Sequence, residues 1–207
     1  MDIGQFFTTN IGIKTRLSLL TKKYVRKDKK KITILEPSFG QGHLVDNLTR
    51  HLTSMALKID GCEIDDKIPY LFDTTKIKRE YCDFLEKNFG KKKYDLIIGN
   101  PPYIKKEKQN LYIKFMEKCL LLLRKKGILV FVIPSTFLQL TKSNEKIIDL
   151  IRNNFKIKYI HAFHDEKMFE NATIDVIIIV IKKIKNKKPK EIKKKYTMIF
   201  NGKKNKN

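Results

Sequence analysis

The four residues with the clearest chemical potential are Asn100-Pro101-Pro102-Tyr103, which directly follow an apolar run at residues 94–99. Both prolines lack an N–H and fix φ, so the Asn100 side chain and the nearby carbonyls are presented as hydrogen-bond acceptors. Tyr103 adds a flat aromatic face beside them. This combination suits a planar group that carries an NH₂, such as the amino edge of a base or a carboxamide. A strand that ends in a proline turn is the alternative interpretation of an isolated Asn-Pro pair.

A second candidate site is the glycine-containing loop Glu36-Pro-Ser-Phe-Gly-Gln-Gly42, which lies between a short apolar run and a helical pattern. Strand, glycine loop and helix are typical of nucleotide binding, because Gly40 and Gly42 permit a tight turn and a close approach of the backbone to a ligand. The full GxGxxG pattern is absent, so a pyrophosphate site is not predicted. Glu63 ends the next predicted strand, 23 positions after Gly40. An acid about 20 residues after such a loop often binds ribose hydroxyls.

A third candidate pair is Asp83-Phe84, at the end of an edge-like strand over residues 77–84. An acceptor beside an aromatic ring is what an adenine ring needs. A core Phe next to a surface Asp is the equally simple alternative.

The elements that position these residues alternate between strands and helices. Seven strands are predicted, at residues 32–35, 58–64, 77–84, 94–99, 128–134, 156–162 and 174–181. The helices between them show apolar residues at spacings of three and four. This order predicts an α/β fold with a Rossmann-like, mostly parallel seven-stranded sheet and helices on both faces. Gly127 is predicted to end the helix that begins near residue 111.

The predicted organisation is one domain over residues 1–183 and a lysine-rich tail over 184–207, with one short strand near its end. The net charge of +23 indicates a polyanionic partner, most simply nucleic acid, although a genome-wide bias toward Lys, Ile and Asn is an alternative explanation. The three Cys lack CxxC spacing, so neither a disulfide framework nor a metal site is predicted. With no apolar run of about 18 residues, we expect a soluble, cytoplasmic protein and no membrane partner.

In their order along the chain, these motifs resemble the S-adenosylmethionine-dependent N6-adenine DNA methyltransferases of the gamma arrangement, the type II, Eco57I-like restriction-modification methylases. The resemblance covers roughly residues 4–183. It implies S-adenosylmethionine as cofactor and DNA as partner, with methyl transfer to N6 of an adenine flipped out of the duplex. Gly4-Gln-Phe-Phe-Thr8 resembles the amino-terminal cofactor motif, with Thr8 at the methionine carboxylate; the family commonly has Pro where this chain has Thr9.

The resemblance also assigns roles along the chain. It implies catalysis by Asn100, Pro101, Pro102 and Tyr103, and stacking of the flipped base between Tyr103 and Phe169. It implies cofactor binding by Glu36, Pro37, Ser38, Phe39, Gly40, Gly42, Glu63, Ile64, Asp83, Phe84 and Asn100.

Three alternatives remain open. Asn-Pro-Pro-Tyr also serves methyltransferases that act on RNA or on a protein glutamine amide. A catalytically silent, methyltransferase-like subunit that binds nucleic acid is the non-enzymatic alternative. Family members that act alone usually carry a target-recognition domain after the last strand, and this sequence predicts none. We therefore expect recognition by a separate specificity subunit, weak specificity, or a truncated relic.

Overall fold

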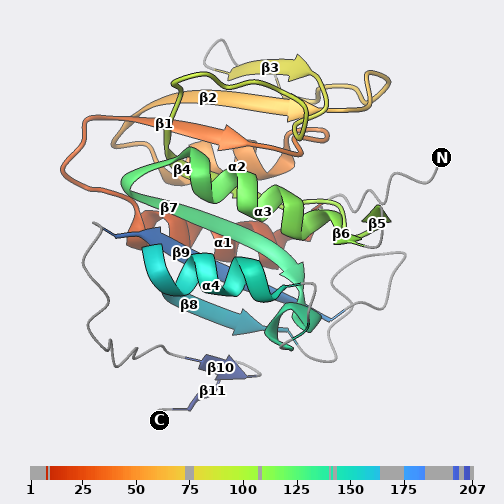
Figure 1. The fold of residues 1–207 in the computed structure, drawn as a ribbon. Helices are drawn as coiled ribbons and strands as arrows, with labels where there is room; N and C mark the ends of the chain where they lie inside the picture. The colour runs from red at the N-terminus through yellow and green to blue at the C-terminus, as the bar shows by residue number, and fades with distance from the viewer. Residues whose placement is uncertain are drawn as a thin grey trace.

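A central sheet forms the middle layer of the molecule, whose structure is a computed structural model (Figure 1). The structure describes residues 8, 10–72, 77–106, 109–139, 141, 144–163, 175–184, 198–200 and 203–205. Within these residues the sheet has nine strands in the order β11-β10-β8-β9-β7-β4-β1-β2-β3.

Seven of these strands are those expected from the sequence: β1 (Lys31–Glu36), β2 (Ala56–Glu63), β3 (Ile77–Tyr81), β4 (Tyr94–Gly99), β7 (Leu123–Pro134), β8 (Phe155–Ala162) and β9 (Val176–Lys183). The strands β1, β2, β3, β4 and β7 run parallel, whereas β9 is antiparallel to both β7 and β8. The predicted Rossmann-like sheet is confirmed, with β3 at its edge as expected. Since five neighbouring strands share one direction, their carboxyl ends meet along one edge.

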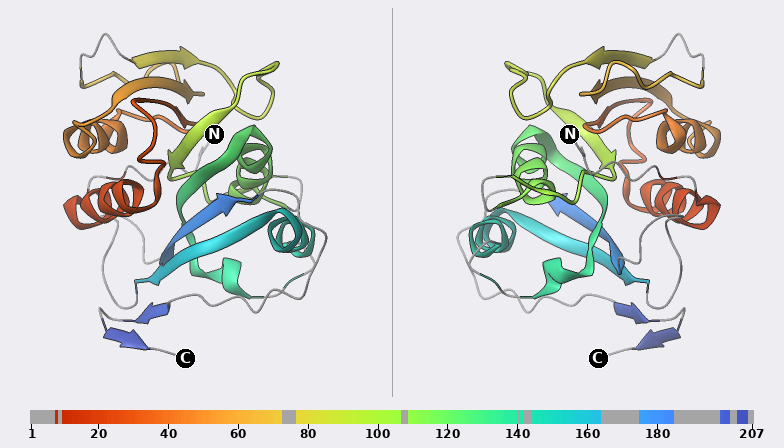
Figure 2. Two further views of the ribbon diagram at one scale, coloured as in Figure 1. Left: turned by 90° about the vertical axis from the view of Figure 1, so that its left-hand side faces the viewer. Right: turned by 90° about the vertical axis from the view of Figure 1, so that its right-hand side faces the viewer.

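Helices cover both faces of the sheet, as Figure 2 shows from two sides. One face carries α1 (Ile11–Tyr24) and α2 (His43–His51), and the other carries α3 (Leu111–Leu122) and α4 (Glu145–Asn154). A short 3₁₀ helix, η1 (Ser135–Leu138), follows β7. Two small strands, β5 (Lys105–Lys106) and β6 (Gln109–Asn110), pair just before α3.

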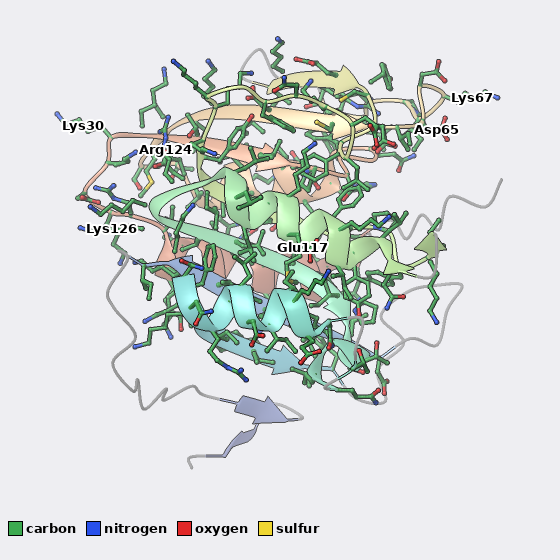
Figure 3. All side chains as sticks on the ribbon, in the orientation of Figure 1. Lys30, Asp65, Lys67, Glu117, Arg124 and Lys126 are labelled. Carbon is green, nitrogen blue, oxygen red and sulfur yellow. The ribbon has the colours of Figure 1, made fainter. Side chains whose placement is uncertain are left out.

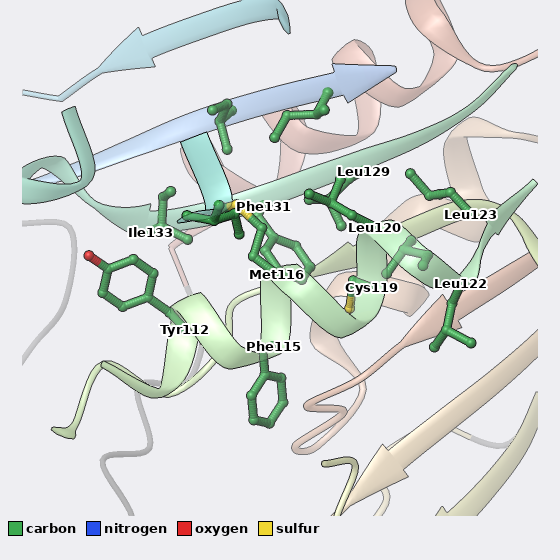
Figure 4. Packing of buried hydrophobic residues seen from close by; sticks show 14 of the residues in the cluster. Tyr112, Phe115, Met116, Cys119, Leu120, Leu122, Leu123, Leu129, Phe131 and Ile133 are labelled. Carbon is green, nitrogen blue, oxygen red and sulfur yellow. The ribbon is translucent and has the colours of Figure 1, made fainter. Parts of the chain in front are cut away.

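The middle parts of the central strands are apolar because both of their faces are covered. In β4, Leu96 and Ile98 belong to the core beneath α1 and α2, while Ile97 belongs to the core beneath α3. Figure 4 shows the second core, in which Met116 and Leu120 of α3 pack near Phe131 of β7. Burial on both faces explains why residues 96–98 of β4 and 128–134 of β7 are consecutive apolar residues and do not alternate with polar ones.

The predicted end of the helix near Gly127 is wrong. The helix α3 ends at Leu122, and Leu123 is already extended, with φ −68° and ψ 136°. Lys126 takes the left-handed conformation, with φ 65°. Gly127 is needed for a different reason: a Cβ there would lie 2.9 Å from the carbonyl oxygen of Arg124 and 3.0 Å from that of Tyr94.

Two strands from the last part of the chain extend the sheet beyond β8. The strand β10 (Met198–Phe200) pairs in parallel with β8, and β11 (Lys203–Asn205) pairs antiparallel with β10. No helix within the described residues is long and apolar enough to span a membrane.

Candidate functional site

The site lies at the edge of the sheet where β1, β2 and β4 end. These strands end at Glu36, Glu63 and Gly99, and β1 lies between the other two in the sheet. The loops that leave them therefore lie side by side. The hydroxyl of Ser38 donates to the backbone carbonyl of Asn100 over 3.1 Å, which joins the glycine loop to the turn after β4.

The glycine loop is held to the end of β2 by two backbone donors. The N–H of Phe39 donates to the carbonyl of Cys62 at 2.8 Å, and the N–H of Gly40 donates to Oε2 of Glu63 at 2.6 Å. Gly42 has φ 91°, and a Cβ there would lie 2.8 Å from the ring of Tyr70. Only glycine satisfies both the backbone angle and the close approach at that position.

Glu63 is buried, with 5% of its surface exposed. Besides the N–H of Gly40, it accepts hydrogen bonds from the N–H groups of Ile64 at 2.9 Å and Asp65 at 3.0 Å. The carboxylate is therefore fixed by the backbone on both sides. Ile64 is 58% exposed, an unusual position for a large apolar side chain immediately after a buried acid.

Glu36 is a buried acid at this edge of the sheet, and one of its carboxylate oxygens lacks a hydrogen-bond partner among the described residues. Glu36 is 2% exposed, and that oxygen is Oε2. Burial, together with the charge of Glu63, raises the pKa of Glu36 well above its ordinary value. Two neighbouring buried acids create a place where a positive charge is strongly stabilised.

A small pocket of about 30 Å³ that opens to solvent lies between the glycine loop and the turn after β4. Its lining includes Thr8, Glu36, Gly40 and Asn100. The fold thus brings together Thr8, the glycine loop and Asn100 at the start of the Asn-Pro-Pro-Tyr turn, which are far apart in the sequence.

Two hydrogen bonds orient the side-chain amide of Asn100. Its Nδ2 donates to the hydroxyl of Thr8 at 3.1 Å, and its Oδ1 accepts from the hydroxyl of Tyr103 at 2.5 Å. Burial raises the pKa of Tyr103 well above its ordinary value, so this hydroxyl stays a neutral donor. The ring of Tyr103 makes an edge contact with Tyr112, with centroids 6.4 Å apart.

Arg79 of β3 is a contributor that the sequence analysis missed. Its guanidinium lies 5.7 Å from the ring centroid of Phe39 and 5.8 Å from that of Tyr70, and it donates to the carbonyl of Ile68 at 3.1 Å. The N–H of Leu71 donates to the carbonyl of Gln41 at 3.4 Å. Arg79 thereby holds the segment after Glu63 against the glycine loop. The available signal was an Arg in a chain whose basic residues are mostly Lys.

The third candidate pair lies apart from the pocket. Phe84 is 2% exposed and packs in the core against Phe89 and Phe115, with ring centroids 5.6 and 4.9 Å apart. Asp83 accepts a hydrogen bond from the N–H of Leu85 at 2.8 Å and so stabilises the turn after β3. Phe169 lies outside the described residues.

Comparison with known protein families places this architecture among restriction-modification enzymes. The family model described as Eco57I restriction-modification methylase matches residues 12–169. Type II methyltransferase M.HincII of Haemophilus influenzae is 32% identical over 212 residues, covering 90% of this chain and 38% of the relative. Modification methylase CviBIII of Paramecium bursaria Chlorella virus NC1A is 35% identical over 123 residues, covering 50% of this chain and 31% of the relative.

Solved structures share the fold at lower identity. A putative class I S-adenosylmethionine-dependent methyltransferase from Listeria monocytogenes superposes with a TM-score of 0.75 at 18% identity, covering 93% of this chain and 65% of that one. The methyltransferase subunit of a type I restriction-modification system from Streptococcus thermophilus gives a TM-score of 0.72 at 17% identity, covering 87% and 45%. The chain therefore spans the shared fold, but only about 38% of the length of M.HincII.

Proposed function

The chain belongs to the Eco57I restriction-modification methylase family, and we propose that it transfers a methyl group from S-adenosylmethionine to the exocyclic amino group of a DNA base, N6 of adenine. The fold and the family imply S-adenosylmethionine as the cofactor. The single observation that carries the proposal is that Asn100, with its amide oriented by Thr8, lines the same pocket as Glu36, whose buried Oε2 has no hydrogen-bond partner among the described residues.

The donor groups at the pocket fit this cofactor. S-Adenosylmethionine carries two positive centres, an ammonium and a sulfonium, while Glu36 is a buried acid without a partner among the described residues. A cationic ligand beside Glu36 and Glu63 would supply the missing charge. Among the described residues, the pocket lining contains no Lys or Arg that could provide this positive charge.

Other contacts to the cofactor follow from the resemblance and support the same site. Thr8 is proposed to bind the methionine carboxylate and Glu63 the ribose hydroxyls. The exposed side chain of Ile64 offers an apolar surface for the adenine ring. Asp83 and Phe84 stay predictions; Phe84 could act only through its backbone while its ring remains in the core.

The proposed role of Asn100 is to activate an exocyclic amine, which is a poor nucleophile. An exocyclic amine delocalises its lone pair into the ring, so positive charge develops on nitrogen as it attacks. If Oδ1 of Asn100 and the carbonyl of Pro101 each accept one N–H, that charge is stabilised and the amine is oriented. When bound, the cofactor would supply an electrophilic methyl group: the N–C bond would form as the S–C bond breaks, the neutral thioether would leave, and the methylated amine would lose its extra proton to solvent. Positioning and electrostatics then provide the catalysis, and no covalent enzyme intermediate is needed.

A base in a duplex must leave the stack to reach this pocket, which costs a few kcal/mol. Stacking on Tyr103 can return about 1–3 kcal/mol. Pro102 keeps the turn rigid between Asn100 and that ring. Phe169 is proposed to close the other face of the base.

The first test offers the purified protein methyl-labelled S-adenosylmethionine with duplex DNA, single-stranded DNA, RNA or a protein extract in separate reactions. Cofactor affinity is measured independently by calorimetry, and Asn100→Ala is the matched variant. Label in DNA that Asn100→Ala loses, even at a cofactor concentration that saturates the variant, supports the proposal. Label only in RNA or protein would replace the substrate. Binding without transfer to any substrate would point to a required specificity subunit or to a silent subunit.

A further inference from the structure

A second cavity lies at the opposite edge of the sheet, where β1, β2, β4 and β7 begin. Its empty volume is about 900 Å³. Among the described residues, its lining has one acid, Asp60, and six cationic side chains: Lys58, Lys91, Lys92, Lys93, Arg124 and Lys125. None of these residues takes part in the methyl-transfer site.

Buried contacts hold the loops around this cavity in place. Asp95, whose side chain is 1% exposed, pairs with Lys29 and with Arg124 and accepts a hydrogen bond from the N–H of Thr33 at 3.0 Å. It therefore ties the loop before β1 and the start of β7 to the start of β4. The contacts of Asp95 bring the basic side chains of these loops together. Among the described residues that line this cavity, none comes from the lysine-rich tail.

The acid at the cavity is already engaged. Asp60 accepts a hydrogen bond from the hydroxyl of Tyr94 at 2.7 Å and lies 3.4 Å from Nζ of Lys92. The side chains of Lys58, Lys91 and Lys125 are exposed to solvent. The cavity therefore presents a strong excess of positive charge to solvent.

The excess continues beyond the cavity. Figure 3 shows Lys30, Arg124 and Lys126 at this end of the sheet, far from Asp65 and Lys67 at the other end. A basic surface that extends past its own cavity suits an extended polyanion better than a single small anion.

We propose that this surface, here called the basic edge (Lys58, residues 91–93 and residues 124–126), binds the phosphate backbone of a nucleic-acid duplex. The lysine ammonium is a compact charge on a flexible side chain, and it binds phosphates without contacting the bases that determine sequence specificity. The strands β1 and β4 are each six residues long, which at about 3.3 Å per residue separates the two edges by roughly 20 Å. A straight duplex bound at the catalytic edge of the sheet does not reach the basic edge. The basic edge therefore binds a second segment of nucleic acid.

The test measures binding of a short fluorescent duplex to the cofactor-free protein across a range of salt concentrations. One variant carries Lys58→Gln, Lys91→Gln and Lys125→Gln. The matched control carries Lys22→Gln, Lys78→Gln and Lys146→Gln, three exposed lysines elsewhere whose replacement removes the same charge. Each lost phosphate contact lowers the slope of log K against log salt by about 0.9. The expected loss of slope is about 2–3 in the first variant and under 1 in the control.

A second readout needs no substitution. Amine-reactive labelling with and without duplex, analysed by mass spectrometry, is expected to show protection of Lys58 and Lys91–Lys93 but not of Lys22, Lys78 or Lys146. Equal effects of the two triple variants would mean that net charge alone acts, and would overturn the proposal. Protection by polyglutamate but not by duplex would overturn it in favour of an acidic protein. Because cofactor binding is measured separately, failure of the methyl-transfer proposal leaves this result unaffected.

Discussion

The hydroxyl of Tyr103 donates to Oδ1 of Asn100 at 2.5 Å, and that oxygen is the acceptor that the proposed chemistry requires. In the substrate-free site the acceptor is thus occupied by a neighbour three residues along the chain. Because an amide oxygen can accept two hydrogen bonds, an incoming amino group must either use the second lone pair of Oδ1 or replace the tyrosine hydroxyl. The same contact keeps the amide oriented until the substrate arrives.

This relationship separates the roles of the ring and the hydroxyl of Tyr103. Tyr103→Phe keeps the stacking surface and removes the competing donor, so we expect kcat/KM to stay within about threefold of the original. Tyr103→Ala removes stacking worth about 1–3 kcal/mol, which lowers kcat/KM by about 5- to 150-fold. Steady-state methyl transfer checks both. Equal losses in the two variants would show that the hydroxyl, and not the ring, carries the effect.

Glu36 makes the stability of the cofactor-free protein depend on pH. Because burial raises the pKa of Glu36 above its ordinary value of 4.5, the protonated form is favoured in the folded state. As pH rises, Glu36 loses its proton at a lower pH in the unfolded state than in the folded state. The contribution of protonated Glu36 to the free energy of unfolding is therefore full below about pH 4.5 and is lost as pH rises through the folded pKa.

Glu36→Gln is expected to raise the unfolding temperature of the cofactor-free protein at pH 7–8 and to weaken binding of S-adenosylmethionine at least tenfold. Thermal unfolding from pH 4 to pH 8 and calorimetry measure the two effects. Glu86→Gln, at an exposed acid, is the control and should change neither. A variant that is less stable at pH 8 and still binds the cofactor normally would disprove the assigned role.

Gly61 is required because the ring of Phe39 fills the space where its Cβ would lie. Gly61→Ala must therefore displace the ring that supports the glycine loop. We expect a loss of about 1–3 kcal/mol in the free energy of unfolding and weaker cofactor binding. Adding Phe39→Leu should recover part of the stability, a coupling that denaturant unfolding of the four proteins in the cycle would measure. Strictly additive losses would contradict the packing argument.

Asp95 is expected to stabilise the protein above its own pKa. Burial acts to raise that pKa, but hydrogen bonds from Lys29 and Thr33 hold it below the ordinary value of 3.8. Its stabilisation is therefore present near neutral pH and is lost as pH falls through the folded pKa.

Asp95→Asn should lower the free energy of unfolding by about 1.5–3 kcal/mol at pH 7. The difference from the original protein should shrink in acid, which urea unfolding at pH 7 and at pH 3 compares. A difference independent of pH would mean that shape, and not charge, accounts for the effect.

The sequence predicted the sheet well because its central strands are buried on both faces. Residues 128–134 are all apolar and residues 94–99 have one charged position, Asp95, so the type and order of these strands could be predicted. The start of β7 could not be predicted, because Arg124 and its neighbours belong to the strand but are exposed to solvent. The periodicity of buried residues does not detect the part of a strand that lies in solvent.

The candidate site was predictable where it depends on strand ends. Glu63, Gly40 and Asn100 follow buried strands, and parallel strands bring their carboxyl ends together. The burial of Glu36 and the contacts of Arg79 with Phe39 and Tyr70 depend on segments distant in sequence, which residue spacing does not reveal. The ring of Phe84 turned into the core because apolar surface from α3 was available there.

The most direct measurement of the central claim is nucleoside analysis of duplex DNA incubated with the protein and S-adenosylmethionine, compared with Asn100→Ala. The account predicts N6-methyladenine from the original protein and at least a thousandfold less from the variant, both measured at saturating cofactor. N4-Methylcytosine would keep the role of Asn100 and correct the base. Equal methylation by both proteins would contradict the account, because the acceptor at Asn100 would then not be needed.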